Sequence, residues 1–407
     1  MNKWVNHQTV GIISILMILI GLLCSEMLMS SGMIILTANA VFNQQIQVNF
    51  RIFFQNRVLL GLTAIFGVVL ISGLWSSNGD WLADRLRMRL PFLLMPFAVV
   101  AIPKFDKKVY FPILASFFWL VIIVCLYSIT HFILNYDAMI EGYKQGHVMF
   151  TPVMHIRFSL IVAVCIAIGW YLYQEKFYLK YPIEQTLILI ASVFLLIYLH
   201  ILAVRTGLVS LYAALGFFVL HNILKTKRYT LGIGLALMMV IALALAIRFV
   251  PTLWNKLGYT LWSLEQIAKG ERLADLSDSY RLATIEAGIQ LGNKQPLLGT
   301  GWGDILDETE AYLQQKYPEL LTIIYMPQSE YLLFYAASGI VGLLIFIWAS
   351  LQPLFYKKAW QNLFICAFHI IMILSFIIEQ TIETQLGTAI YIIFAVMNIR
   401  FQMESDK

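Results

Sequence analysis

The sequence of 407 residues has little charge: Asp, Glu, Lys and Arg make up 13% of it, whereas hydrophobic residues make up 60%. Its mean hydropathy of +0.77 lies far outside the range of soluble globular domains. The composition therefore indicates a protein that crosses a membrane several times. Most of the Lys and Arg behind the net charge of +5 are explained by membrane topology, so no nucleic-acid partner is expected.

The chain also lacks the motifs of several enzyme and transporter classes. No Walker phosphate loop is present, because the nearest arrangement, Gly292-Asn293-Lys294, has neither a preceding strand nor a Ser/Thr. HExxH and CxxC zinc spacings are missing, and all four cysteines lie in apolar segments, so we expect no metal site and no cofactor. Carboxylates are nearly missing from the middle of the apolar segments, which argues against a proton-coupled carrier.

Apolar segments long enough to span a membrane recur along the whole chain. They predict an all-α bundle of about twelve transmembrane helices, with a large external loop between the ninth and tenth. The fourth segment, residues 90–102, is expected to be short and broken by Pro91 and Pro96. The predicted segments are residues 10–24, 27–41, 58–74, 90–102, 110–134, 156–173, 186–204, 207–224, 231–249, 331–351, 362–378 and 387–399.

The short loops show a charge bias that assigns them to two sides. Lys and Arg are concentrated in alternate loops, which places both termini in the cytoplasm and the long loop outside. The organisation predicted is therefore a membrane region of about nine helices at residues 1–250, an external loop with short helices at 251–328, and about three further helices at 329–407. The basic residues of the inner loops are Arg51, Arg57, Lys104, Lys107, Lys108, Lys176, Lys180, Lys225, Lys227, Arg228, Lys357 and Lys358.

A few arginines break this pattern and are candidate functional residues. They lie at or near the expected outer face, where topology disfavours cations, so each needs a partner. One alternative is a protein carboxylate, for which Glu379 and Glu383 are placed on the same side. The other is an anionic ligand, because the planar guanidinium fork suits phosphate oxygens. The arginines are Arg85, Arg87, Arg89, Arg157, Arg205 and Arg281.

The long loop contains the most polar part of the chain. Asp278 and Ser279 are expected to cap a short helix that ends near Leu291, with Gly292 as its stop. The glycine-rich run Pro296–Asp304 follows. It predicts a plain turn, and an anion site made of backbone N–H groups is the alternative.

These pieces resemble the O-antigen ligase/polymerase superfamily, integral-membrane glycosyltransferases of the GT-C class. The similar stretches are LWSSNGDWLADRLRMRLPFLLMP (74–96), AVRTGLVSLYAAL (203–215), YRLATIEAGIQLGNKQPLLGTGWGD (280–304), PQSEYLLFYAASGIVGLL (327–344) and EQTIETQLG (379–387).

The resemblance implies transfer of a sugar chain from undecaprenyl diphosphate without a metal. By position, Arg205 and Arg281 match the family arginines that are thought to hold the diphosphate of the donor. Two guanidinium groups suit this task, because negative charge develops on the diphosphate as the glycosidic bond breaks. Arg85, Arg89 and Arg157 are possible secondary contacts to the anionic ligand.

The sequence departs from the family where the ligase histidine is expected. That position is Gln328, in Pro327–Leu332, and an amide orients a hydroxyl but does not take its proton. Three readings remain open: Glu330 acts as the base, diphosphate departure dominates with Gln328 positioning the acceptor, or the chain is a polymerase-type relative.

The resemblance as a whole implies an O-antigen ligase in the inner membrane of a Gram-negative bacterium, with its active site at the periplasmic face. The donor is an undecaprenyl-diphosphate-linked glycan, the acceptor is lipid A–core, and membrane lipids surround the protein. One alternative is an O-antigen or exopolysaccharide polymerase that acts on polyprenyl-linked repeat units. The other is a non-enzymatic flippase or exporter of lipid-linked glycans, which would need arginines lining a central cavity.

Overall fold

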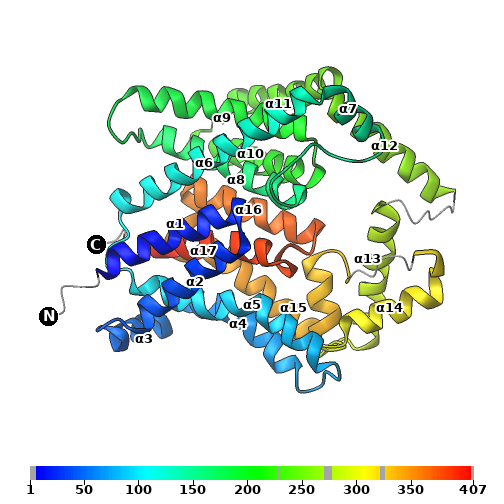
Figure 1. Ribbon diagram of the computed structural model, residues 1–407, viewed down its shortest axis with the longest axis horizontal. Coiled ribbons are helices and arrows are strands. Elements are labelled where there is room, and N and C mark those ends of the chain that lie inside the picture. Colours follow the sequence, from blue (N-terminus) through cyan, green and yellow to red (C-terminus); the bar gives the residue numbers. More distant parts are fainter. Residues whose placement is uncertain (1–5, 228, 270–276, 321–325, 405–407) are drawn as a thin grey trace. The chain divides into compact units, whose positions relative to one another are not determined.

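A computed structural model describes residues 6–227, 229–269, 277–320 and 326–404. Every regular element in these ranges is an α-helix or a short 3-10 helix (Figure 1). This confirms the all-α prediction for the part of the chain that is described.

The chain divides into two compact units. Unit 1 comprises Met1–Tyr110, Ser263–Lys357 and Phe376–Lys407, and unit 2 comprises Phe111–Trp262 and Lys358–Ser375. Unit 1 holds α1 (His7–Cys24), α2 (Glu26–Val41), α3 (Ile46–Gln55), α4 (Arg57–Ser72), α5 (Gly79–Ala98), η1 (Val99–Ala101), α13 (Ser277–Lys294), α14 (Ile305–Lys316), η2 (Pro318–Leu320), α15 (Glu330–Phe355), η4 (Thr381–Glu383) and α17 (Gln385–Glu404). Unit 2 holds α7 (Tyr136–Lys144), α8 (His155–Gln174), α9 (Ile183–Leu202), α10 (Arg205–Thr226), α11 (Tyr229–Phe249) and most of α6 (Lys107–Leu134), α12 (Pro251–Ala268) and α16 (Leu363–Ile378). The helix η3 (Tyr356–Gln361) lies at the boundary.

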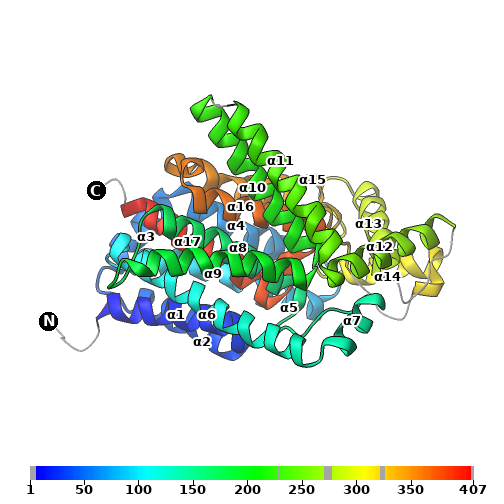
Figure 2. The ribbon, with the colours of Figure 1, turned by 90° about the horizontal axis from the view of Figure 1, so that it is seen from above.

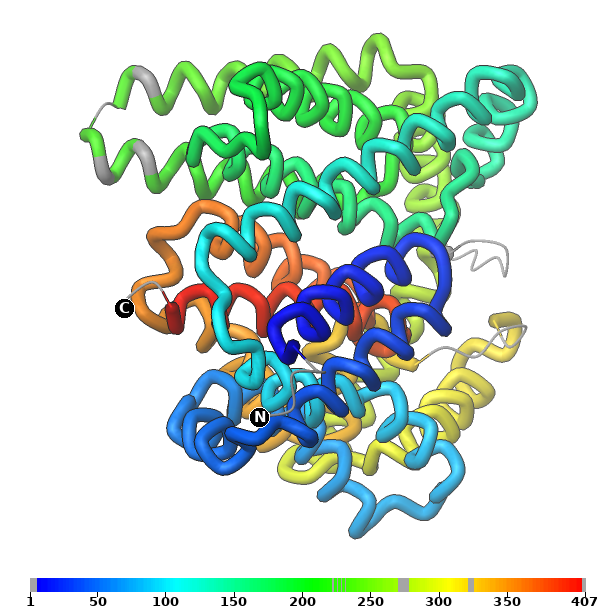
Figure 3. The backbone as a smooth tube through the Cα atoms, turned by 60° about the vertical axis from the view of Figure 1, so that its left-hand side comes forward, coloured from blue at the N-terminus to red at the C-terminus, as the bar shows by residue number. Residues whose placement is uncertain are grey.

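Neighbouring helices in each unit form antiparallel hairpins. In unit 1, α1 and α2 lie side by side (Figure 3). They meet at Ser25, which caps α2 by accepting a hydrogen bond from the N–H of Leu28. In unit 2, α10 and α11 lie side by side (Figure 2). Each helix of such a hairpin satisfies the hydrogen bonds of its own backbone N–H and C=O groups, as a hydrocarbon environment requires.

All twelve predicted membrane segments fall on helices. Among the described residues, seven helices are long and apolar enough to cross a membrane, or eight if the bent pair α3–α4 is one span. Three shorter apolar helical stretches are α2, Arg205–His221 within α10, and α16, and α5 carries too many charges to qualify by hydropathy. The chain is an integral membrane protein, and the count of twelve stays a prediction.

The fourth predicted segment is different from the expectation. Pro91 and Pro96 do not break it, because α5 runs through both prolines from Gly79 to Ala98 and begins eleven residues before the predicted start at residue 90. A proline removes one backbone donor, and membrane helices tolerate this where neighbouring segments satisfy the freed carbonyl. The longer helix carries Arg85 and Arg89 on one face, four residues apart.

Polar contacts within unit 1 join segments that the charge bias assigns to the same side. On the expected inner side, Gln8 exchanges hydrogen bonds with the backbone of Lys104, and the Asn56 amide donates to the Tyr356 hydroxyl at 3.2 Å. On the expected outer side of unit 1, Asp304 accepts from the N–H groups of Ser77 and Asn78. These contacts support the predicted alternation of the loops.

Candidate active site

The glycine-rich run before α14 is a turn, and its amides bind the protein itself. The N–H groups of Thr300 and Gly301 donate to the carbonyls of Ala336 and Ala337 at 2.9 and 3.0 Å. Those of Trp302 and Gly303 donate to the hydroxyls of Ser72 and Ser76. The alternative prediction, an anion site made of these N–H groups, is therefore wrong, because the groups already donate hydrogen bonds to acceptors in the protein.

Two glycines let this turn contact the backbone of α15 directly. Gly299 has φ +69°, and a Cβ there would lie 2.4 Å from the carbonyl carbon of Ala337. Gly339 has φ +63° and kinks α15, and a Cβ there would lie 2.3 Å from the Leu297 carbonyl. Only glycine adopts this backbone without strain, so the turn holds the kinked start of α15 in place.

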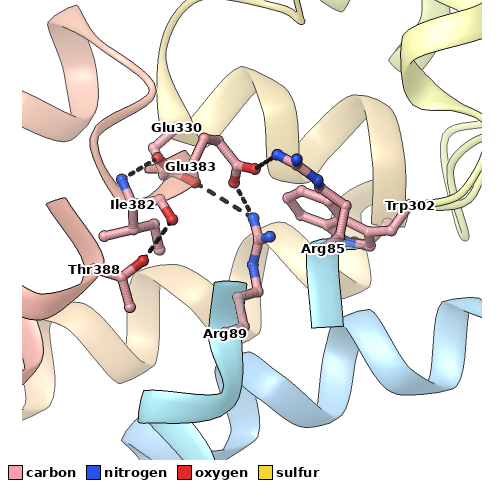
Figure 4. A network of polar contacts seen from close by, with 8 residues as sticks. Arg85, Arg89, Trp302, Glu330, Ile382, Glu383 and Thr388 are labelled. Atoms are coloured by element: carbon pink, nitrogen blue, oxygen red, sulfur yellow. Dashed lines mark hydrogen bonds and ion pairs between the residues drawn. The ribbon is translucent and has the colours of Figure 1, made fainter. Parts of the chain in front are cut away.

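Two buried arginines of α5 form an ion cluster with two glutamates (Figure 4). Arg89 is paired with Glu383 and lies 3.9 Å from Glu330, while Arg85 lies 3.3 Å from Glu383. We call Arg85, Arg89, Glu330 and Glu383 the closed cluster. Its formal charges balance, which is required when charges are this deeply buried.

The indole of Trp302 forms one wall of the closed cluster. Its ring lies 3.9 Å from the Arg89 guanidinium carbon, and its N–H donates to the Ser338 hydroxyl at 2.6 Å. A desolvated cation over an indole is a favourable contact. Among the described residues, no acceptor bonds Nε or Nη1 of Arg89 or Nε of Arg85.

The segment Glu379–Glu383 joins three parts of unit 1. Glu383 pairs with α5, and the backbone N–H of Ile382 donates to Glu330 at the start of α15 at 3.1 Å (Figure 4). Glu379 pairs with Arg281 of α13. The short segment therefore links the α5 arginines, Glu330 and Arg281 through its two carboxylates and one amide.

Arg281 lies in the second turn of α13 and is more accessible than the closed cluster. Its side chain is 26% exposed, compared with 0% for Arg89, and Glu379 is its carboxylate partner. We call Arg281 and Glu379 the open pair. The sequence left two alternative partners open for this arginine, a protein carboxylate and an anionic ligand. They are compatible, because an incoming ligand could take the place of Glu379 at Arg281.

The helix that carries Arg281 differs from its prediction at both ends. It begins at Ser277, ahead of Asp278 and Ser279, and continues through Gly292 to Lys294. Gly292 is not the stop, because the ring of Tyr335 packs against it where a side chain would otherwise lie. Packing of α13 against α15 thus extends the helix by a turn.

The segment with Gln328 meets α13 at Pro327, which packs against Gly288. The helix α15 begins at Glu330, so Gln328 lies outside it, as predicted. Ser329 occupies the cap position with φ +84°, but its hydroxyl donates to the Phe376 carbonyl rather than capping the helix. A serine at positive φ is strained, and such strain often occurs at functional sites.

Gln328 and Glu330 differ in their burial and in their hydrogen-bond partners. Gln328 is half-buried, and its side-chain oxygen has no hydrogen-bond donor among the described residues. Glu330 is fully buried, with one oxygen bound to the Ile382 amide and the other near Arg89. Gln328 is the less buried of the two residues, but its unbonded side-chain oxygen is itself buried.

Arg157 and Arg205 lie in unit 2, each at the start of a helix. Arg205 is the first residue of α10, and two residues separate it from Leu202, where α9 ends, so the short gap between the predicted segments 186–204 and 207–224 is confirmed as a tight junction. Gly207 packs against Ser159 of α8, which brings together the helix starts that carry both arginines. A cation in a first turn opposes the helix dipole, so neither arginine is needed for helix formation.

Among the residues that the structure describes, no three His, Cys, Asp or Glu side chains are grouped as a metal site. The expectation that the reaction needs no metal stays a prediction.

Residues 190–347 match the family model of O-Antigen ligase. This match covers less than half of the chain and supports the O-antigen ligase/polymerase superfamily. A comparison with curated proteins gives no match. Members of the superfamily are glycosyltransferase-like ligases and polymerases, so the match supports an enzyme. The matched range contains Arg205, Arg281, Gln328 and Glu330, whereas Arg85, Arg89, Arg157 and Glu383 lie outside it.

Proposed function

We propose that this O-antigen ligase family member transfers a polysaccharide from undecaprenyl diphosphate to lipid A–core at the periplasmic face of the inner membrane. The observation that carries the proposal is the family match over residues 190–347, which includes the four residues assigned here to the reaction. The reaction breaks the bond between the sugar C1 and the diphosphate oxygen, and forms a bond from C1 to an acceptor hydroxyl oxygen.

In this proposal, Arg205 and Arg281 bind the diphosphate and stabilise the charge that develops as it leaves. Each guanidinium offers two parallel donors, so no metal is needed for charge stabilisation. The partial exposure of Arg281 supports its part, since an exposed guanidinium can exchange Glu379 for a phosphate oxygen. Arg157 is assigned as a secondary contact to the anionic ligand, whereas Arg85 and Arg89, which Glu330 and Glu383 balance, are assigned to holding the fold.

Gln328 orients the acceptor hydroxyl, and Glu330 keeps Arg89 and the Glu379–Glu383 segment in position. The burial of Glu330 supports a positioning role over that of a general base. The hydroxyl proton then leaves to the departing diphosphate or to solvent. A diphosphate is a good leaving group, so this step does not depend on a strong base.

A polymerase that joins polyprenyl-linked repeat units is the second candidate, because Gln328 replaces the histidine expected in ligases. The lipopolysaccharide of a deletion strain separates the two. Free core with polymer accumulating on the carrier supports the ligase, and core with a single repeat unit supports the polymerase. Core without polymer, together with undecaprenyl-linked glycan trapped in the cytoplasmic leaflet, would favour the flippase.

The periplasmic placement has its own test. A reporter fused after Lys294 should be active only in the periplasm, and one fused after Lys358 only in the cytoplasm, because the charge bias assigns these positions to opposite sides. If both reporters are active on the same side of the membrane, the proposed periplasmic placement of the active site is wrong.

A further inference from the structure

A groove in unit 2 is lined mainly by aromatic and amide side chains. It lies between the end of α7 and one face of α12 and has a volume of about 500 Å³, within the ~300–1,000 Å³ range of ligand pockets. Its lining residues are Lys144, Gln145, Trp254, Asn255, Gly258, Tyr259 and Trp262.

The groove is built by a fixed contact between the two helices. Lys256 donates a hydrogen bond to the Gly146 carbonyl after α7 ends. Gly146 has φ +87°, and a Cβ there would lie 2.8 Å from the Tyr259 ring. Glycine at this position therefore lets the turn after α7 close on α12 and define one side of the groove.

The aromatic residues of α12 follow the helical repeat. Trp254, Gly258 and Trp262 are four residues apart and share one face, so the two indoles lie about 12 Å apart along the helix axis. They are 60% and 45% exposed. A Cβ added at Gly258 would meet nothing within 4 Å, so the space between the indoles is open.

Amides stand beside these rings, and charge is scarce. Asn255 and Gln145 offer donors and acceptors, whereas the only charged lining residue, Lys144, is paired with Glu141 at 2.9 Å. Sugar rings combine apolar C–H faces with hydroxyl groups, and aromatic faces next to amides complement both. A diphosphate would instead require several cations.

Two exposed leucines of α12 lie beside the groove without lining it. Leu257 and Leu261 are three and seven residues after Trp254, next to it on the same broad face of the helix. Tryptophan also anchors helices at membrane interfaces, but an interfacial anchor does not need a groove, paired amides or an open glycine.

We propose that this groove binds uncharged sugar residues of the polysaccharide chain, away from the diphosphate. The inference rests on the proposed function for the nature of the substrate. Stacking on Trp254 and Trp262, with hydrogen bonds to Asn255, would hold the glycan while its end reacts.

The test measures binding of polysaccharide released from the lipopolysaccharide of the source bacterium by mild acid, and therefore free of lipid. The full-length protein is used in nanodiscs, and titration calorimetry gives the affinity. Gly258→Phe should fill the groove without a clash and weaken binding at least tenfold, with an unchanged melting temperature. Trp254→Ala combined with Trp262→Ala should do the same. Leu257→Ala combined with Leu261→Ala is the matched control and should bind normally.

The other outcomes overturn the proposal. Normal binding by Gly258→Phe means that the glycan does not use the groove. If the tryptophan variant loses affinity for phosphatidylglycerol vesicles but keeps its polysaccharide affinity, the tryptophans are a membrane anchor. The lipopolysaccharide banding of the deletion strain tests the proposed function separately. If the banding is that of a ligase mutant but the groove variants bind polysaccharide normally, only the groove proposal is rejected. If the groove variants lose binding but the deletion strain has normal lipopolysaccharide, only the ligase proposal is rejected.

Discussion

Two groups of arginines meet the same segment, Glu379–Glu383, and they differ in their access to solvent. In the closed cluster, Arg89 is fully buried and balanced by Glu330 and Glu383. In the open pair, Arg281 has one partner and is 26% exposed. The same chemical group can therefore hold the fold in one place and remain available to a ligand in the other. Exposure, rather than the number of arginines, distinguishes these roles.

The largest effect is expected from breaking the closed cluster. Arg89→Gln leaves a buried carboxylate without its cation, and removing one partner of a buried ion pair costs about 3–5 kcal/mol. The variant should lose most of its folded protein in the membrane, measured by detergent-solubilised yield and melting temperature.

A compensating variant serves as the control. Arg89→Met combined with Glu330→Met removes one charge of each sign and leaves the Arg85–Glu383 pair, so much of the yield should return. If the Arg89→Gln protein is instead produced at a normal level and loses only its transfer activity, Arg89 belongs with the ligand-binding arginines. The distinction between the closed cluster and the open pair would then be wrong.

The next effect concerns the open pair. Arg281→Lys keeps the charge but loses the planar fork, and the loss of a matched donor to a developing charge costs roughly 10²–10³ in rate. Polymer attachment to lipid A–core should fall by that factor at a normal membrane level, and Arg205→Lys should behave alike. Lys294→Gln, at the far end of α13, is the control. Near-native transfer by both lysine variants would return these arginines to a topological role.

A smaller effect is expected at Gln328. Gln328→Ala loses one orienting hydrogen bond, on the order of 1 kcal/mol, so transfer should fall about fivefold with normal production. Glu330→Gln should instead reduce the protein level, because it unbalances the closed cluster. The reverse result, with Glu330→Gln produced normally but losing transfer 10²–10⁴-fold, would identify Glu330 as the general base.

Much of the architecture could be predicted from the sequence, because hydrophobic length is a local property. The apolar segments each became a helix, and the tight junction before Arg205 was confirmed. Glu379 and Glu383 could be named as partners of the arginines, because the charge bias placed them on the same side. Which arginine meets which glutamate depends on tertiary packing and could not be predicted.

The errors share a physical cause: contacts from distant segments override local signals. Gly292 is a helix stop only until the Tyr335 ring packs against it, and the amides of Thr300 and Gly301 are free only until α15 accepts from them. In α13 the small residues Ala283 and Ala287 are buried, whereas Leu282 is exposed. Hydrophobicity alone does not predict this orientation, since close helix packing favours small side chains.

The smallest effect concerns the support of the open pair. Five residues after Arg281, Glu286 of α13 accepts hydrogen bonds from Lys316, Tyr317 and Tyr312 of the following segment. Next to it, Tyr280, Ala283, Leu313, Tyr317 and Leu320 form a small apolar core. The contacts of Glu286 therefore help to hold α14 against the helix that presents Arg281.

The pH dependence of this support has a definite sign. The hydrogen bond from Lys316, and then that from Tyr317, lower the pKa of Glu286 from 4.5 to about 2. A carboxylate whose pKa is lower in the folded state stabilises it above pH 4.5 and loses this contribution as the pH falls towards 2. Amide hydrogen exchange in α14, measured at pH 6 and pH 3 and corrected for intrinsic rates, should show reduced protection at pH 3. Glu286→Gln should show low protection at both pH values, and Glu310→Gln, which contacts only Gln314 among the described hydrogen bonds, should resemble the wild type. Because the Glu286 side chain is partly exposed and that of Lys316 more so, solvent screens their contact and the change should be small. Equal protection of the wild type at both pH values would show that the apolar core alone holds α14, and that Arg281 needs no electrostatic support.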